Sequence, residues 1–234
     1  MIENNALNTI YNMDCIEGMK RLIKKYGEQC VDVTLTDIPY GGVSKKGAER
    51  AKYGGQLRKF DKGEADIETF DLDEFLELTA KITKGSVYIF CGASQLSQIY
   101  DFFESKNKEF MVRLCSWKKT NPTPANGQHM WLSSMEICIF AKRRKTKFNQ
   151  HCKSAVWEFP VGRSKIHPTE KPLDLFKYLI ESSSDEGDVI FDPCMGSGTT
   201  AVASKLLKRE YIGFELHKPY FDDANKRLSE LHNE

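Results

Sequence analysis

Residues 188–200 read DVIFDPCMGSGTT, and this stretch sets the architecture that we expect for the chain. An apolar run leads into a turn with Gly196 and Gly198, after which the residues have helical spacing. Glycine permits a tight turn and lets the backbone approach a ligand closely, so the stretch predicts a strand, a ligand-binding turn and a helix. The next predicted strand, residues 210–214, leads into Glu215, whose carboxylate can accept hydrogen bonds from ribose hydroxyls. This part of the chain is therefore expected to bind a nucleoside.

The glycine turn alone leaves several classes of protein open. A Walker A loop is excluded, because no Lys-Ser or Lys-Thr pair follows Gly198. The spacing from Gly196 to Ala201 fits a loose G-x-G-x-x-A pattern, which an NAD-dependent dehydrogenase also shows, and a glycine-rich turn without a ligand is a further alternative. Only 19 residues follow Glu215, so we expect no second nucleotide-binding half after it. The remaining strands are expected earlier in the chain, an order that disfavours a dehydrogenase.

A second stretch, residues 31–40, reads VDVTLTDIPY and combines a predicted buried strand with a polar turn. In the turn, the Asp37 carboxylate and the Ile38 carbonyl can accept the two N–H groups of a planar amine, and Pro39 keeps the backbone stiff. Tyr40 offers a ring on which a base outside its duplex can stack. A plain strand-to-loop turn is the alternative. Because open α/β sheets bind ligands at the carboxyl ends of their strands, we expect both stretches to form one site.

Together, these stretches resemble the motifs of the amino-directed DNA methyltransferases, which methylate adenine N6 or cytosine N4 with S-adenosyl-L-methionine. Residues 37–40 resemble the catalytic D/S/N-P-P-Y motif, and residues 191–200 resemble the cofactor motif D-P-F-x-G-S-G-T. Residues 11–18 resemble the N-terminal segment of the family, residues 117–124 its W-x-K-x-N-P-x-P stretch, and residues 167–172 its H-P-T-x-K-P segment. The resemblance covers nearly all of the chain, and the order of the motifs is similar to that of the β group.

The resemblance implies a site-specific DNA methyltransferase that acts on adenine N6, because Asp rather than Ser stands at the first catalytic position. Cytosine N4 is the alternative acceptor. An RNA or protein methyltransferase and a catalytically weak nucleic-acid-binding protein of the same fold also stay open. The catalytic residues that the resemblance implies are Asp37, Ile38, Pro39 and Tyr40. The residues that it implies for binding S-adenosyl-L-methionine are Asp14, Cys15, Thr169, Lys171, Asp192, Pro193, Gly196, Gly198, Thr199 and Glu215.

Two positions depart from the family pattern. Ile38 stands where the family usually has proline, and we expect this change to leave the catalytic turn less restrained. Cys194 stands where the cofactor motif has phenylalanine, and we expect this change to remove an aromatic wall beside the cofactor. Weaker activity or weaker cofactor binding is the expected consequence.

The predicted strands and helices alternate along the chain, which favours an α/β fold. The resemblance implies a Rossmann-like, doubly wound, mostly parallel seven-stranded sheet of the class I methyltransferase type, with one antiparallel edge strand, in a single domain over residues 1–234. Strands are expected at residues 7–13, 31–36, 86–91, 111–117, 135–141, 188–190 and 210–214, the fourth and fifth as an antiparallel pair. Helices are expected at residues 16–26, 72–82, 96–103, 172–180, 199–208 and 219–231.

The composition is typical of a globular protein, since 40% of the residues are hydrophobic and 29% are charged. No segment is long and apolar enough to span a membrane and no signal peptide is recognisable, so we expect a cytoplasmic protein. The resemblance implies that a bacterium or a phage encodes it. The seven cysteines include no C-x-x-C pair, which favours reduced thiols, most of them buried. No metal site is expected.

The net charge is only +1, but the charges form blocks. Residues 41–62 carry seven basic residues against two acidic ones, and residues 113–147 carry eight basic residues against Glu136 alone. Such blocks favour a basic face that meets DNA phosphates, with an ordinary solvated surface as the alternative. Residues 41–62 also contain five glycines, so we expect a mobile basic loop there. The expected nucleic-acid contacts are Lys45, Lys46, Arg50, Lys52, Arg58, Lys118, Lys119 and Arg163.

Residues 148–165 and the basic loop leave less room for target recognition than is usual in the family. We therefore expect a short recognition sequence, or a second subunit that supplies specificity. The candidates for DNA contact are His151, Trp157, Phe159 and Arg163, and for Trp157 a place in the core is the favoured alternative. Double-stranded DNA is the expected partner. A homodimer and a cognate restriction nuclease acting on the same site are further partners that the resemblance allows.

Overall fold

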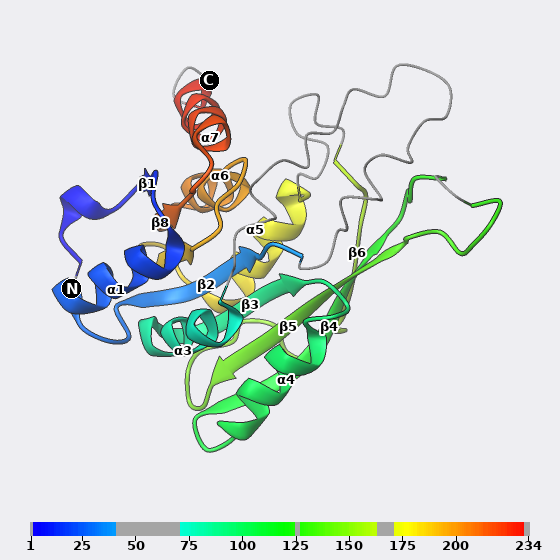
Figure 1. The fold of residues 1–234 in the computed structure, drawn as a ribbon, viewed down its shortest axis with the longest axis horizontal. Coiled ribbons are helices and arrows are strands. Elements are labelled where there is room, and N and C mark those ends of the chain that lie inside the picture. The colour runs from blue at the N-terminus through cyan, green and yellow to red at the C-terminus, as the bar shows by residue number, and fades with distance from the viewer. Residues whose placement is uncertain (1, 41–70, 125–126, 163–170, 232–234) are drawn as a thin grey trace.

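The structure is a computed structural model that describes residues 2–40, 71–124, 127–162 and 171–231. Its centre is one eight-stranded sheet with the strand order β1-β8-β7-β2-β3-β5-β4-β6 (Figure 1). The strands are β1 (Thr9–Tyr11), β2 (Val31–Asp37), β3 (Thr83–Cys91), β4 (Phe110–Lys119), β5 (Met135–Arg143), β6 (Val156–Phe159), β7 (Val189–Asp192) and β8 (Glu210–Phe214). A short 3-10 turn, η1 (Asn4–Ala6), precedes the helices α1 (Cys15–Tyr26), α3 (Leu72–Ile82), α4 (Leu96–Ser105), α5 (Leu173–Ser183), α6 (Thr199–Leu206) and α7 (Lys218–Glu230).

Helices cover both faces of the sheet, as predicted for a doubly wound fold (Figure 1). Helices α1, α3 and α4 pack on one face, α5 and α6 pack on the other, and α7 packs against α6. The side chains of β3 alternate between the two cores: Val87 and Ile89 lie in the first, and Tyr88 and Phe90 lie in the second. Because both faces are buried, β3 and β7 contain continuous apolar runs, at residues 87–91 and 189–191.

The mostly parallel α/β sheet is confirmed, but two details of the prediction are wrong. The sheet has eight strands rather than seven, because β6 pairs in parallel with β4, from Ser116↔Val156 to Lys119↔Phe159, and forms an edge. The antiparallel strand is β5, which lies between β3 and β4 and is therefore internal. A four-residue strand with one neighbour shows too little periodicity to be recognised in the sequence.

Most predicted elements appear close to their predicted bounds. Helix α3 has the predicted bounds, α4 is two residues longer, and α6 ends at Leu206 rather than at residue 208. Pro172 is the N-cap of α5 rather than its first residue. Strand β1 has only three residues, because the chain leaves the sheet on either side of its short pairing with β8.

All seven cysteines have free thiols, and Cys15, Cys91, Cys115 and Cys138 are buried. This distribution agrees with the prediction of free thiols, most of them buried. Within the described ranges, no helix has the length and apolar character that crossing a membrane requires.

Candidate active site

Three acidic residues lie at the ends of neighbouring strands. Asp37 ends β2, Asp192 ends β7, and Glu215 follows β8. These strands are adjacent and parallel, in the order β8-β7-β2, so their carboxyl ends share one edge of the sheet. The two stretches singled out in the sequence therefore meet at one place, as predicted.

The catalytic turn begins directly after β2, and Ile38 anchors it. The backbone N–H of Ile38 donates a hydrogen bond to the Phe90 carbonyl at 3.2 Å. The Ile38 side chain is 2% exposed and packs in the core that α1, α3 and α4 cover. A proline at this position has no N–H to donate. Isoleucine thus restrains the turn by a hydrogen bond and by packing, and a looser turn than proline would give stays a prediction.

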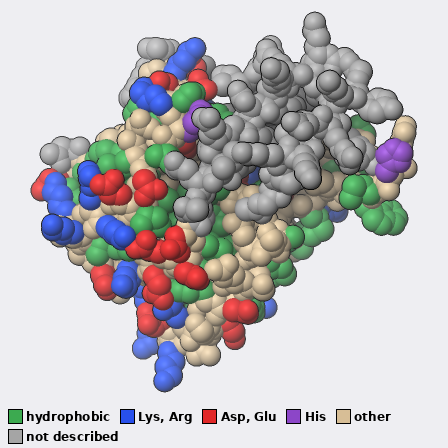
Figure 2. All heavy atoms as spheres, in the orientation of Figure 1, with side chains coloured by type: hydrophobic (Ala, Val, Ile, Leu, Met, Phe, Trp, Pro, Cys, Tyr) green, Lys and Arg blue, Asp and Glu red, His purple; other side chains and the backbone are tan. Residues whose placement is uncertain are grey.

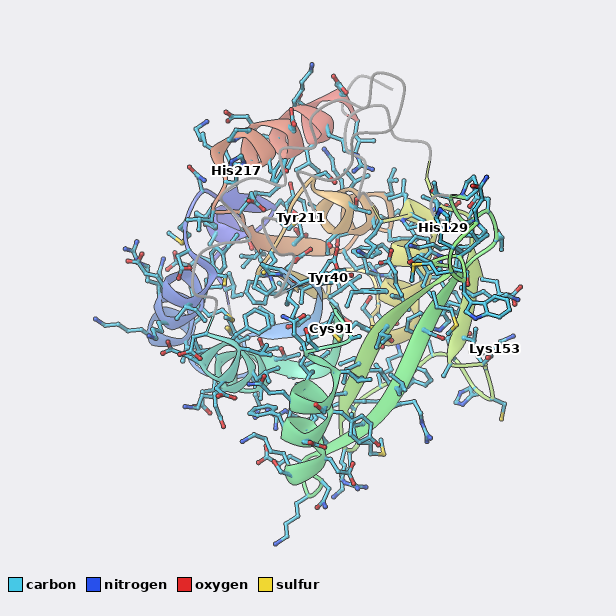
Figure 3. The ribbon with its side chains drawn as sticks, turned by 45° about the vertical axis from the view of Figure 1, so that its right-hand side comes forward. Tyr40, Cys91, His129, Lys153, Tyr211 and His217 are labelled. Carbon is cyan, nitrogen blue, oxygen red and sulfur yellow. The ribbon has the colours of Figure 1, made fainter. Side chains whose placement is uncertain are left out.

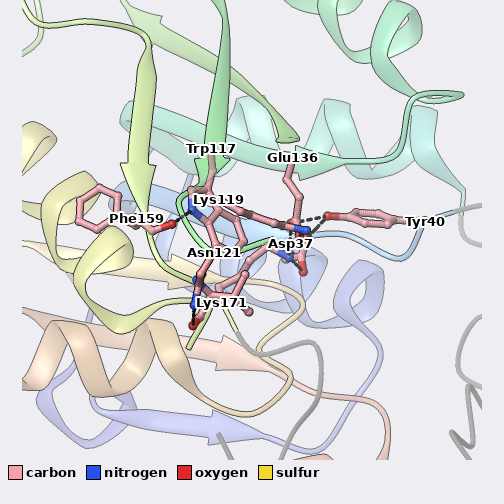
Figure 4. A network of polar contacts seen from close by, with 9 residues as sticks. Asp37, Tyr40, Trp117, Lys119, Asn121, Glu136, Phe159 and Lys171 are labelled. Atoms are coloured by element: carbon pink, nitrogen blue, oxygen red, sulfur yellow. Dashed lines mark hydrogen bonds and ion pairs between the residues drawn. The ribbon is translucent and has the colours of Figure 1, made fainter. Parts of the chain in front are cut away.

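Asp37 stands at the end of a chain of polar contacts (Figure 4). Its Oδ1 accepts a hydrogen bond from the Tyr40 hydroxyl at 2.8 Å, and its Oδ2 pairs with the Lys171 ammonium group. Lys171 also pairs with Glu136 Oε2 at 3.1 Å, and Lys119 pairs with Glu136 Oε1 at 2.8 Å. The Tyr40 hydroxyl lies 3.4 Å from the same Glu136 oxygen. Basic and acidic groups thus alternate from Lys119 through Glu136 and Lys171 to Asp37. We call these four residues the ion-pair chain.

The members of this ion-pair chain differ in burial. The side chain of Lys171 is 8% exposed, whereas that of Asp37 is 31% exposed. Burial raises the pKa of Asp37, and the neighbouring ammonium group offsets this effect only in part. Burial acts on the pKa of Glu136 in the same sense, but Lys171 and Lys119 outweigh it and hold that pKa below its ordinary value. Asp37 is therefore the acid that remains open to a substrate, and Glu136 is a fixed anion.

Two residues at the site were not predicted as site residues. Gln95, which is buried at the start of α4, donates from Nε2 to the Pro39 carbonyl at 2.9 Å and accepts from the Gly92 N–H at 3.0 Å. Nothing in the sequence marks this glutamine. Glu136 is predicted from the sequence only as part of a strand. Its isolation as the single acid of residues 113–147 is the signal that identifies it in retrospect.

The glycine turn is fixed by two carboxylates. Asp192 is 3% exposed, and it accepts hydrogen bonds from the Cys194 N–H at 3.0 Å and from the Thr200 hydroxyl. Burial raises the pKa of Asp192 to about 7. Glu215 accepts a hydrogen bond from the Gly196 N–H at 2.7 Å. The turn is thus tied to β7, where it begins, and to the end of β8.

The turn needs glycine for its conformation and its packing. The φ angles are 53° at Gly196 and 81° at Gly198, in the left-handed region that favours glycine. A side chain at Gly198 would begin 3.0 Å from Cβ of Ala224 in α7. Glu215 is half-buried beside the turn, and burial raises its pKa. A turn of small residues beside a carboxylate acceptor fits a nucleoside cofactor, whose ribose hydroxyls are donors.

Other predicted cofactor residues have structural partners of their own. Asp14 caps α1 and accepts a hydrogen bond from the Glu17 N–H at 2.9 Å. Cys15 is buried at the start of α1, and a hydrogen bond with its thiol, together with burial, raises the pKa of Cys194. Lys171 directs its ammonium group to the two acids of the ion-pair chain. Contact of these residues with a cofactor stays a prediction.

The predicted nucleic-acid contacts are only partly covered by the structure. Lys118 is exposed and pairs with Glu158 at 2.9 Å, whereas Lys119 points into the ion-pair chain. Trp157 is buried, as predicted. Several predicted site residues lie outside the described residues: Lys45, Lys46, Arg50, Lys52, Arg58, Arg163 and, for the cofactor, Thr169.

The connection between β4 and β5 exposes large apolar side chains. Trp131 is 96% exposed and Met130 is 67% exposed. Figure 2 shows hydrophobic side chains and a histidine protruding at one corner of the molecule, and Figure 3 places His129 at that corner, away from Tyr40. The connection leaves β4 directly after Lys119, so it extends from the edge of the sheet that carries the ion-pair chain. We call residues 129–132 the apolar tip.

Comparison with known proteins gives one family and several relatives. The model of the N6/N4 methyltransferase family, described as DNA methylase, matches residues 31–226. The type II methyltransferase M.HinfI of Haemophilus influenzae is 30% identical, with 97% of this chain and 70% of that protein covered. The type II methyltransferase M2.DpnII of Streptococcus pneumoniae is 30% identical, with 92% of this chain and 88% of that protein covered.

Two solved structures illustrate the structural similarity. The M1.HpyAVI–SAM complex superposes with a TM-score of 0.70 at 30% identity, and the match covers 94% of this chain and 98% of that one. The cytosine-N4-specific PvuII DNA methyltransferase superposes with a TM-score of 0.69, covering 96% of this chain and 91% of that one. At 14% identity, this second match shows the fold alone.

Proposed function

This chain belongs to the family of N6/N4 DNA methylases, which use S-adenosyl-L-methionine, and we propose that its acceptor is the exocyclic N6 of adenine in double-stranded DNA. The observation that carries the proposal is the Asp37 carboxylate. It lies at the same sheet edge as the glycine turn, accepts a hydrogen bond from Tyr40, and remains partly open to solvent. Adenine is favoured because Asp rather than Ser stands at the first catalytic position, and cytosine N4 is the alternative.

The amine of a nucleobase is a poor nucleophile, because its lone pair is delocalised into the ring. The target base leaves the duplex and stacks on Tyr40. Its two N–H groups donate to the Asp37 carboxylate and to the Ile38 carbonyl, which favours a more tetrahedral nitrogen. Bound S-adenosyl-L-methionine would supply an electrophilic methyl group on a sulfonium centre and would leave as the neutral thioether. The proton that the amine loses would pass by way of the Asp37 carboxylate to solvent. Much of the rate then comes from the positioning of the two reacting atoms.

The residues at the cofactor end divide into ligands and supports. Glu215 accepts from the ribose hydroxyls, and the backbone at Gly196 and Gly198 lies against the cofactor. Asp192 is a support, because it is only 3% exposed and its oxygens accept hydrogen bonds from the turn and from α6. It keeps the glycine turn in shape without touching the cofactor.

DNA approaches the sheet edge that carries Asp37. The apolar tip extends from this edge, and a large exposed aromatic side chain can stack on a base or fill the space that a flipped base leaves. Trp131 is therefore our candidate for DNA contact. A homodimer and a restriction nuclease acting on the same site stay predictions.

The product of the reaction tests the proposal directly. The purified protein is incubated with S-adenosyl-L-methionine and unmethylated bacterial DNA, and the modified nucleosides are identified by mass spectrometry. N6-methyladenine is expected, whereas N4-methylcytosine would establish the alternative acceptor. An Asp37→Ala variant is expected to bind the cofactor and to lose methylation. Retained DNA methylation by this variant would overturn the mechanism.

A further inference from the structure

The ion-pair chain extends well beyond the residues that engage the amine. Lys171, Glu136 and Lys119 add three charged groups behind Asp37, and they come from three segments that are far apart in the sequence (Figure 4). Strand β5 runs antiparallel to β3, so its first residues rather than its last reach the catalytic edge of the sheet. This direction brings Glu136 to the site.

We propose that Glu136 and Lys119 are positioning residues for methyl transfer. They hold the Lys171 ammonium group so that it stabilises the charge of the Asp37 carboxylate without occupying all of its hydrogen-bond acceptor sites. The inference rests on the proposed function and adds two residues to it. Both residues act through Lys171, and neither has to touch the DNA or the cofactor.

The burial of Lys171 explains why a second acid is needed. Its side chain is 8% exposed, and a buried ammonium group requires acceptors for its three N–H donors. With Asp37 as its only partner, the ammonium group would settle on that carboxylate and compete with the amine of the base. Glu136 Oε2 lies 3.1 Å from the Lys171 nitrogen and shares the charge. Asp37 thereby keeps lone pairs for its substrate.

Lys119 fixes the end of the ion-pair chain that lies farthest from Asp37. Its side chain is 16% exposed, lies over the Trp117 ring at 5.4 Å and pairs with Glu136 at 2.8 Å. With an ammonium group on each oxygen, Glu136 has a pKa below its ordinary value, so it remains an anion and is a poor acceptor for a proton from the amine. The pKa of Lys171 is raised, because its two acidic partners outweigh its burial. The two positive and two negative charges therefore cancel.

The groups that face Asp37 come from each neighbouring element. They are Tyr40 in the turn, Cys91 of β3, Glu136 and Cys138 of β5, Lys171 before α5, and Asp192 of β7. Burial raises the pKa of both thiols, to about 11 for Cys91, so both are neutral at physiological pH. Among the residues that the structure describes, Lys171 is the one cation in this group. Its removal and the removal of Glu136 should therefore shift the pKa of Asp37 in opposite directions.

The experiment is a pH titration of the Asp37 carboxyl carbon by NMR in the full-length protein and its variants. Lys171→Met removes the cation and is expected to move the titration to higher pH by about one unit or more. Glu136→Gln removes a neighbouring anion and is expected to move the titration to lower pH. Lys119→Met lets Lys171 shift toward Glu136 and is expected to give a smaller move to higher pH.

Single-turnover methylation at saturating cofactor and DNA supplies the second readout. The Lys171→Met and Glu136→Gln variants are expected to methylate about tenfold or more slowly. The acid limb of each rate profile should follow the titration, and the cofactor affinity of Glu136→Gln should stay unchanged. Glu109→Gln is the matched control, because it breaks an ion pair with Arg143 of 2.6 Å at the opposite end of the β4–β5 pair. It is expected to change neither the titration nor the rate.

A folded Glu136→Gln variant whose Asp37 titration stays in place or moves to higher pH would overturn the proposal, as would an undiminished rate. Circular dichroism establishes folding, and Lys119→Met is the second variant if Glu136→Gln does not fold. Opposite shifts with N4-methylcytosine as the product would reject adenine and keep the positioning role. N6-methyladenine without opposite shifts would reject the positioning role alone. A protein that methylates no DNA would overturn both.

Discussion

At the level of single residues, the two departures from the family motifs have local explanations. Ile38 replaces the stiffness of a proline ring by a hydrogen bond to Phe90 and by a buried side chain. Cys194 packs against the core beside α1, where its thiol interacts with Cys15. The first departure thus keeps the catalytic turn in place. The predicted effect of the second on cofactor binding stays a prediction.

Ile38→Pro restores the family motif, but we expect it to destabilise this protein. The variant loses the N–H that bonds to Phe90 and part of a buried side chain, which together cost about 2–4 kcal/mol. Urea unfolding measures the loss. Ile38→Val keeps the N–H and is expected to cost only about 1 kcal/mol. Equal stability of the two variants would show that the hydrogen bond contributes nothing.

At the level of elements, the turn between β3 and α4 supports the catalytic turn. Gln95 joins the two turns through the Pro39 carbonyl and the Gly92 N–H. The Gln95 side chain is 8% exposed, so the two backbone groups lie where water has little access. The buried Gln95 amide thereby links the loop that carries Tyr40 to the end of β3 through two hydrogen bonds.

Gln95→Leu has a similar shape and lacks both polar atoms. It leaves two backbone groups unpaired, so we expect a loss of about 2 kcal/mol or more in the free energy of unfolding, together with slower methylation. Gln98→Leu on the same helix is the control, because it removes only an exposed hydrogen bond to Asp73 of 2.9 Å. The control should change stability by less than about 0.5 kcal/mol. Similar losses in both variants would remove the supporting role of Gln95.

The apolar tip is an element whose side chains do not pack in the core. Trp131→Ala should leave stability unchanged, because this side chain is 96% exposed. If Trp131 stacks on a base, its loss should weaken DNA binding by about 1–3 kcal/mol. Fluorescence anisotropy measures the affinity, and 2-aminopurine at the target position reports base flipping. Met111→Ala, a 43% exposed position at the other end of β4, is the control, and equal affinities of both variants would argue against DNA contact at the tip.

At the scale of the whole molecule, the first and last strands of the chain complete the cofactor half together. Strand β1 pairs with β8 from Thr9↔Ile212 to Tyr11↔Phe214. The Tyr11 carbonyl accepts a hydrogen bond from the Glu215 N–H at 3.0 Å, and the Asn12 side chain donates to the Glu215 carbonyl at 2.8 Å. The proposed ribose acceptor therefore depends on the packing of both ends of the chain.

S-adenosyl-L-methionine should stabilise the whole folded chain, because its site is assembled from distant segments and does not exist in the unfolded state. At 100 times its dissociation constant, one ligand adds about 2.7 kcal/mol to the free energy of unfolding. Thermal unfolding with and without the cofactor measures this effect. Glu215→Ala should remove most of it, and Glu230→Ala, exposed on α7, should retain it. An undiminished stabilisation in Glu215→Ala would contradict the assigned ribose contact.

Much of the fold and part of the site could be predicted because their signals are local. An apolar run followed by a polar turn marks the end of a buried parallel strand, so the placement of Asp37, Asp192 and Glu215 at one sheet edge follows from the sequence. The bounds of α3 follow from helical spacing alone. Such patterns involve residues that are neighbours in the chain, and a single sequence displays them.

The place of β5 beside β3, the pairing of β6 with β4, and the residues that β5 brings to the site were decided only by tertiary packing. The antiparallel pairing of β4 with β5 is as predicted, but Glu136 reaches Lys171 because β5 lies between β3 and β4, and no local pattern states that position. Gln95 and the N–H of Ile38 likewise find their partners across elements. Pairing between distant segments depends on which surfaces are buried together. The acidic residues at the strand ends can therefore be predicted from the sequence. The ion-pair chain behind Asp37 forms only when distant segments pack together in the folded molecule.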